Sequence, residues 1–219
     1  AMGMGVCGAF VYIAADTTTA TNIGLIYAAS PVMIILMARF GYGEALSLRQ
    51  ILGVAICLTG VLAIIARGDP ASLAALEFSE GDLWIVAAAF GWAVYSVQQN
   101  HRPSAMGLMT RLSAVIGAGV LVLLPFTIWE ITYLGAGLPQ GEAFGYMLFL
   151  ALVPGLAAYA AYARIQTSLG ASKAGLTMYL IPLYNGALAY LLLDEVPQLY
   201  HLVGAGLVLP GLWLATRRA

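Results

Sequence analysis

Eight strongly apolar stretches, most of them about 20 residues long, follow one another along this chain. As helices, about 20 residues cross a hydrocarbon core of about 30 Å. The stretches cover residues 1–15, 20–40, 48–66, 83–101, 106–129, 143–164, 172–193 and 198–216. This arrangement predicts an all-α polytopic membrane protein with eight visible transmembrane helices.

The composition excludes several other classes of protein. Apolar and aromatic residues make up 62% of the 219 residues and charged residues only 9%, against about 45–50% and about 25% in soluble domains. A net charge of −1 argues against a nucleic-acid partner. The two cysteines, Cys7 and Cys57, cannot supply a disulfide scaffold. Because the Cys and His residues lack metal-ligand spacing, no metal and no cofactor is expected.

The basic residues indicate how the spans are oriented, because Lys and Arg of short loops stay on the cytoplasmic side. We place the C-terminus in the cytoplasm and let the spans alternate. Only Arg67 then falls on the outer side. The cytoplasmic face collects Arg39, Arg49, Arg102, Arg111, Arg164, Lys173, Arg217 and Arg218.

The second half of the chain repeats a pattern of the first half at an offset of 151 residues. The identical pairs are Gly24 and Gly175, Pro31 and Pro182, Glu44 and Glu195, Gly53 and Gly204, and Gly60 and Gly211. Five identities at one offset indicate an internal duplication. Because Glu44 and Glu195 fall at opposite faces, we predict repeats of opposite topology, an architecture found in secondary transporters.

The repeat predicts three parts of the chain. Residues 1–67 are expected to hold the last three helices of the first repeat, and residues 68–82 an extracytoplasmic linker. Residues 83–219 are expected to hold the five helices of the second repeat. By this reasoning two further helices should precede Ala1, which gives ten in the natural protein.

Two copies of one motif carry a resemblance to a known family. The first copy reads Ser30-Pro31-Val32, Gly43-Glu44, Gly53, Gly60, and the second reads Leu180-Ile181-Pro182, Asp194-Glu195, Gly204, Gly211. Together with Tyr200-His201-Leu202-Val203-Gly204 and Pro210-Gly211, these motifs resemble the EamA domain of the drug/metabolite transporter superfamily. The resemblance covers essentially the whole chain. It implies two inverted five-helix repeats and export or facilitated transport of metabolites or amino acids across a bacterial inner membrane.

Polar and aromatic side chains within the spans are the candidate substrate-binding residues, since polar groups inside a membrane are costly and suggest function. Helical spacing places several of them on shared faces. The candidates are Tyr27, Ser30, Trp92, Tyr95, Gln99, Tyr159, Tyr162, Tyr179 and Asn185. For the mid-span aromatic rings, packing between helices is an equally good explanation. Pro31 and Pro182 are expected to interrupt their helices and to act as hinges.

These observations favour a secondary transporter that moves small amphipathic solutes, such as amino acids, by alternating access. Its expected partners are a small-molecule substrate and the lipid bilayer, with a homodimer as one assembly to test. Two alternatives stay open: an integral membrane enzyme acting on lipid-linked substrates, and a non-transporting scaffold. An enzyme would need converging acids, His or metal ligands at one interface, whereas the acids here are scattered. Glu44 and Glu195 are interpreted as structural residues of turns rather than proton sites.

Overall fold

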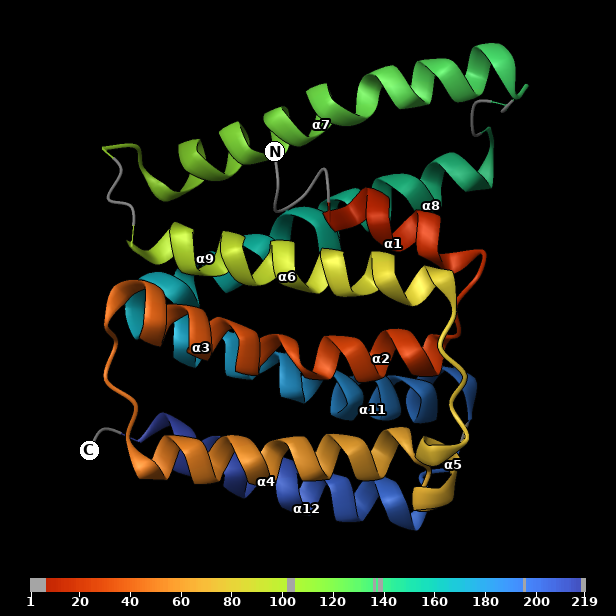
Figure 1. The fold of residues 1–219 in the computed structure, drawn as a ribbon. Helices are drawn as coiled ribbons and strands as arrows, with labels where there is room; N and C mark the ends of the chain where they lie inside the picture. Colours follow the sequence, from red (N-terminus) through yellow and green to blue (C-terminus); the bar gives the residue numbers. More distant parts are fainter. Residues whose placement is uncertain (1–6, 102–104, 136, 138–139, 195, 218–219) are drawn as a thin grey trace.

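The computed structural model describes residues 7–101, 105–135, 137, 140–194 and 196–217. These residues form helices joined by short turns (Figure 1). The first part of the chain contains α1 (Cys7–Ala15), α2 (Ala20–Ala28), α3 (Ser30–Tyr42), α4 (Leu48–Ile65), α5 (Pro70–Ala74) and α6 (Glu80–His101). The second part contains α7 (Leu108–Tyr133), α8 (Glu142–Leu150), the π-helix η2 (Ala151–Ala157), α9 (Ala158–Leu169), α10 (Ala171–Gly175), the 3₁₀-helix η3 (Leu176–Leu180), α11 (Ile181–Leu193) and α12 (Leu199–Thr216).

The protein is an all-α polytopic membrane protein, as the apolar stretches predict. Each predicted stretch is helical over most of its described residues. Within the described ranges, 6 helices are long and apolar enough to cross a membrane by length and composition. Large apolar side chains face outward on α7 and α8, where Leu121, Phe126 and Phe149 are all more than half exposed. Such a surface suits contact with lipid.

Each repeat contains one helix that is divided near its proline. The break between α2 and α3 falls at Ala29, and the break between η3 and α11 falls at Leu180. The two positions are 151 residues apart and have nearly identical backbone angles, φ −80° and ψ −16° against φ −79° and ψ −15°. Proline lacks the N–H that a helix interior needs, so the first turn is its most favourable position in a helix. Pro31 and Pro182 both occupy that position.

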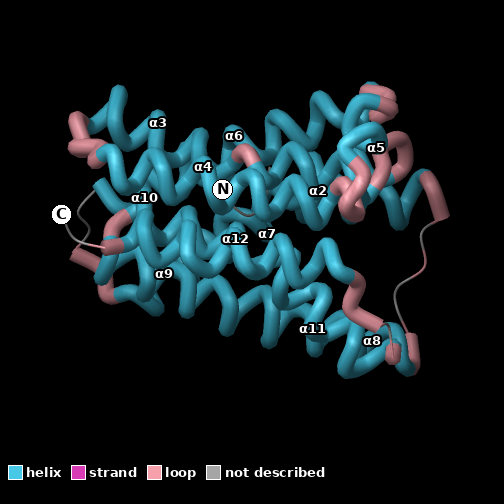
Figure 2. Tube along the Cα trace, turned by 90° about the horizontal axis from the view of Figure 1, so that it is seen from below, coloured by secondary structure: helices cyan, strands magenta, loops and turns pink. Residues whose placement is uncertain are grey.

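The closest helix pair joins the two repeats. Helices α4 and α12 run antiparallel and side by side (Figures 1 and 2). A Cβ atom at Gly53 would lie 2.5 Å from the carbonyl oxygen of Gly211, and one at Gly60 would lie 2.8 Å from that of Gly204. Only glycine permits backbones to approach this closely. The four glycines, which the sequence pairs by the 151-residue offset, therefore form the seam between the repeats.

Between these glycine contacts, Cys57 lies against Val208, and its Sγ donates to the Val208 carbonyl oxygen at 3.4 Å. These two residues are also 151 apart. This one equivalent pair thus faces itself across the seam, and the glycine pairs cross on either side of it, as expected around a pseudo-two-fold axis in the membrane plane.

The two ends of the bundle differ in charge. The turn from α3 to α4 lies at the same end as the C-terminus, whereas the turn from α11 to α12 lies at the other end (Figure 1). The helix ends that carry the described basic residues Arg39, Arg49, Arg111, Arg164, Lys173 and Arg217 gather at the first of these ends. Arg67 follows α4 at the opposite end. Arg102, Arg218 and Glu195 lie outside the described residues.

A polar cluster holds the start of α6, and we call it the Asp82 cluster. The sequence placed Asp82 in an outer loop, but the structure buries it to 2% exposure. Its carboxylate accepts hydrogen bonds from the Thr18 hydroxyl, from Nδ2 of Asn22 at 2.9 Å and from the Ser79 backbone N–H at 2.7 Å. Asp82 precedes the apolar stretch 83–101. Burial raises the pKa of this carboxyl, but the hydrogen bonds from Thr18, Ser79 and Asn22 outweigh it, and the pKa is lowered.

A second polar cluster holds the far end of α6, and we call it the Glu44 cluster. Oε1 of Glu44 lies 3.1 Å from Nε2 of His101, and the Ser172 hydroxyl donates to Oε2. The ring of Tyr42 stacks on that of His101, with centroids 4.1 Å apart. Glu44 therefore ties the turn after α3 to the end of α6 and to α10, which supports the structural role expected from the sequence.

Candidate functional site

The main pocket lies between the two repeats and has a volume of about 440 Å³. Helices α2 and α4 line it from the first repeat, and η3, α11 and α12 line it from the second. Much of its lining is apolar, with Val61, Ile65 and Met178 among the residues. This size and this apolar character are typical of small-molecule sites, which take up roughly 300–1,000 Å³.

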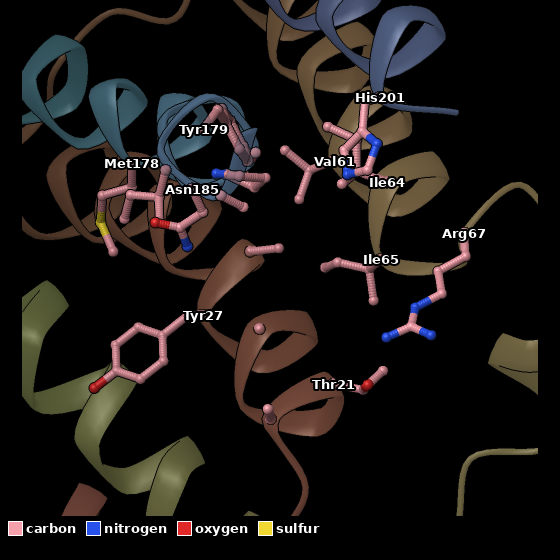
Figure 3. A pocket seen from close by; sticks show the side chains of 17 residues that line it. Thr21, Tyr27, Val61, Ile64, Ile65, Arg67, Met178, Tyr179, Asn185 and His201 are labelled. Atoms are coloured by element: carbon pink, nitrogen blue, oxygen red, sulfur yellow. The ribbon is translucent and has the colours of Figure 1, made fainter. Parts of the chain in front are cut away.

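A few polar groups face the same space. Figure 3 shows Arg67 and His201 on one side of the pocket and Tyr179 and Asn185 on the other. Thr21 of α2 completes this set. No Asp or Glu belongs to the described residues that line the pocket. The pocket is therefore positive, with Arg67 as the source of its charge.

The backbone places Arg67 at the end of α4. Arg67 has a φ of 52°, in the left-handed region that favours glycine. The Arg67 N–H donates to the carbonyl of Ile64 and the N–H of Gly68 to that of Ala63, so the helix closes with this turn. From there the side chain extends toward the pocket (Figure 3).

A helix cap fixes the ring of His201. Gln198 is the N-cap of α12, and its backbone N–H donates to Nδ1 of His201 at 3.1 Å. Since Nδ1 accepts this bond, the ring is neutral and its proton is on Nε2. A Cβ at Gly186 of α11 would lie 3.3 Å from Cδ2 and 3.8 Å from Nε2. The edge of the ring that carries Cδ2 and Nε2 thus lies close to Gly186 of α11.

Tyr179 supplies a buried hydroxyl. Its side chain is 1% exposed, yet its oxygen has no hydrogen-bond partner among the described residues. Buried polar atoms are normally satisfied, so such an atom calls for an explanation. A substrate that enters the pocket could provide the missing partner.

An aromatic cluster lies beside the pocket, between α6 and α9. The ring of Trp92 lies 5.6 Å from that of Tyr95, 5.6 Å from that of Tyr159 and 5.3 Å from that of Tyr162, measured between centroids. The Tyr162 hydroxyl lies 3.2 Å from Oγ of Ser96. Nε1 of Trp92 is buried without a partner in the part of the chain that the structure describes.

The predicted site residues thus divide into separate groups rather than lining a single cavity. Tyr27, Tyr179, Asn185 and Pro182 line the main pocket. Trp92, Tyr95, Tyr159 and Tyr162 form the aromatic cluster. Two residues connect the groups. Tyr27 packs against a buried cluster that includes Ile85 and Ala89 of α6, and Met178 packs against the same buried cluster as Trp92.

The remaining predicted residues lie elsewhere. Gln99 and Arg111 line a smaller pocket of about 180 Å³. The backbone carbonyl oxygen of Gln99 accepts a hydrogen bond from Nη2 of Arg111 at 2.6 Å. Ser30 is fully buried beside the break between α2 and α3, and Pro31 is buried in the first turn of α3. Gln166 of α9 is also buried, with 2% exposure, and its Nε2 donates to the Ser96 backbone carbonyl at 3.2 Å.

Sequence reasoning did not identify Thr21, Arg67 or His201 as pocket residues. Arg67 carried a usable signal, because it was the only basic residue assigned to the outer side. His201 carried a weaker one, three residues after Gln198 at the start of a predicted helix. Among the described residues, no group of three His, Cys, Asp or Glu is placed to hold a metal ion.

A sequence profile of the EamA-like transporter family matches residues 1–66 and 79–217. The chain belongs to this family. The resemblance inferred from the repeated Pro, Glu and Gly motifs is thereby confirmed.

Several named relatives of this EamA-like protein are transporters. An uncharacterized transporter of Archaeoglobus fulgidus is 26% identical over 220 residues, covering 96% of this chain and 71% of the relative. A probable terminal-alkyne amino-acid exporter of Streptantibioticus cattleyicolor is 26% identical and covers 91% of this chain and 65% of its own length. A probable amino-acid metabolite efflux pump of Escherichia coli is 24% identical, with shares of 87% and 65%.

The fold also matches a solved structure. A crystallised protein that is 21% identical aligns with a TM-score of 0.77, covering 98% of this EamA-like chain and 74% of its own. At this identity the match shows the fold alone. The family and the names of the relatives indicate transport rather than catalysis.

Proposed function

We propose that this protein is a secondary exporter of small amphipathic metabolites, amino acids among them, that works by alternating access. The observation that carries the proposal is the main pocket, whose walls come from both repeats. A site shared between repeats can be exposed to either side when one repeat moves against the other. The relatives named as amino-acid exporters support this substrate class.

The two proline-linked breaks support a moving part next to the pocket. Ala28 of α2 and Pro182 of α11 both line it, and each lies within two residues of a break. The seam between α4 and α12 has no such break and is packed on backbone atoms. We therefore assign the seam to the fixed part, and Pro31 and Pro182 to the hinges.

We also propose the orientation of the protein in the membrane and the extent of its two repeats. The end that gathers the basic residues faces the cytoplasm, by the positive-inside rule, in a bacterial inner membrane. The C-terminus and the Glu44 cluster are then cytoplasmic, and Arg67 and the mouth of the pocket are outside. The repeats correspond to residues 1–67 and 83–219, joined by the linker 68–82.

Counterflow of labelled amino acids into proteoliposomes that contain the full chain tests the proposal. We expect saturable flux that an excess of unlabelled substrate inhibits. Tyr179→Phe removes only the unpartnered hydroxyl, so it should raise the KM about tenfold while the protein folds normally. Tyr184→Phe is the matched control, because Tyr184 is the exposed neighbour of Asn185 and does not line the pocket. Absence of flux for every metabolite tested would contradict the proposal.

A further inference from the structure

The polar rim of the main pocket presents hydrogen-bond donors and one positive charge. Arg67 contributes a guanidinium, which is charged at any physiological pH. His201 contributes an Nε2–H, because its Nδ1 is occupied by the Gln198 N–H. The described lining residues include no carboxylate. Among these described residues a cationic group of a ligand therefore meets no counter-charge, whereas an anionic group meets one.

The guanidinium of Arg67 is available to a ligand. The structure gives it no hydrogen bond and no ion pair with any described residue. Its backbone also adopts a left-handed φ that costs an arginine more than a glycine. Strain of this kind, at a residue that lines a pocket, points to use of the side chain.

The rest of the lining suits an apolar body. It includes Val61 and Ile65 of α4 and Met178 of η3, and Tyr179 is buried there with a hydroxyl that lacks a partner among the described residues. A second, smaller pocket of about 290 Å³ shares His201 and Gly186 with the main one and continues toward the turn before α12. A ligand could thus place a charged head at the rim and an apolar tail toward the middle of the bundle.

We infer that Arg67 and His201 form a carboxylate-binding subsite, which selects organic acids and zwitterions with an apolar or aromatic body and rejects organic cations. Arg67 binds the carboxylate as a charge-assisted, bidentate donor. His201 donates one further hydrogen bond through Nε2. The inference rests on the proposed transport function and names its substrate class.

Three phenylalanine-like compounds of similar shape allow the contributions of the carboxylate and the amine to binding to be measured separately. L-phenylalanine has both charges, 3-phenylpropionate has only the carboxylate, and phenylalaninamide has only the amine. Binding is measured as the ligand-induced shift in melting of the purified full chain, and flux is measured in proteoliposomes. We expect the two carboxylates to bind at least tenfold more tightly than phenylalaninamide.

Variants then locate the subsite. Arg67→Gln should abolish this preference, and Arg49→Gln, the same change at the other end of α4, should leave it intact. His201→Asn keeps an acceptor where Nδ1 lies and removes the Nε2–H, so it should weaken carboxylate binding about tenfold without loss of the helix cap.

The readouts separate this inference from the proposed function. Equal binding of all three compounds, or an Arg67→Gln variant that keeps the preference, overturns the carboxylate subsite even if flux is observed. Selective carboxylate binding without flux supports the subsite and overturns the transport function. Absence of both binding and flux overturns both.

Discussion

The two ends of α6 are held in different ways. At one end Asp82 is buried and accepts hydrogen bonds from neutral donors, in the first turn of the helix, where a negative charge is favoured. At the other end Glu44 and His101 remain 28% and 19% exposed. Because Asp82 is buried and Glu44 and His101 are partly exposed, we expect the start of α6 to be held more firmly than its end.

The proton requirement sharpens this contrast. Nδ1 of His101 lies 3.0 Å from the Val97 carbonyl oxygen, which can only accept, so Nδ1 carries a proton. A hydrogen bond between Nε2 and Glu44 then requires a second proton, held either on Nε2 of His101 or on the Glu44 carboxylate. The Asp82 cluster needs no such proton. The bond between His101 and Glu44 therefore depends on an added proton, whereas the hydrogen bonds of the Asp82 cluster do not.

The largest effect is expected from Asp82→Ala. It leaves the Thr18 hydroxyl, the Asn22 amide and the Ser79 N–H without their acceptor in a buried site. The free energy of unfolding should fall by about 3 kcal/mol, as measured by equilibrium unfolding in detergent micelles. Glu80→Ala, in the same helical turn but exposed, is the control and should change little. Similar losses in both variants would argue against a special role for the buried carboxylate.

A pH effect at the same end should be smaller. The pKa of Asp82 is lower in the folded protein than its ordinary value of 3.8. The stability that this group contributes is thus fully present above the unfolded pKa and is lost as the pH falls through the folded pKa. Melting scans between pH 7 and about pH 3 should show a steeper loss for the native protein than for Asp82→Asn. Parallel curves would show that Asp82 does not contribute.

The smallest effect is expected from His101→Ala at the Glu44 cluster. This pair is partly exposed, so its loss should cost less than about 1 kcal/mol of stability. Its effect should appear instead in the exposure of this end of the bundle, measured as faster amide hydrogen exchange in residues 43–47. Ser172→Ala, which removes the other bond to Glu44, should act in the same direction. A loss as large as that of Asp82→Ala would reverse the comparison.

Much of the fold could be predicted from the sequence because it depends on local and repeated features. Apolar length defines each helix, and proline sets the breaks near Pro31 and Pro182. The 151-residue offset paired Gly53 with Gly204 before any contact was known. The offset could not show which glycines touch. In the structure Gly53 faces Gly211, the counterpart of Gly60, and not its own counterpart Gly204.

The candidate site was only partly predictable. Helical spacing correctly placed Trp92 with Tyr95, and Tyr159 with Tyr162, on faces that meet. Arg67 was assigned to a loop, and its approach to the pocket depends on one left-handed residue and a long side chain. Asp82 was assigned to the linker 68–82, whereas the structure places it in the first turn of α6. Periodicity describes helix faces, and it does not describe how the chain turns at helix ends.

The seam between α4 and α12 has a consequence for the origin of such proteins. Gly53 faces Gly211, the counterpart of Gly60, and Gly60 faces Gly204, the counterpart of Gly53, so the surface of α4 that meets α12 is complementary to its own copy. Two separate half-length chains inserted in opposite senses could associate through the same surface. Fusion of their genes would then have required a connecting segment and no new contact.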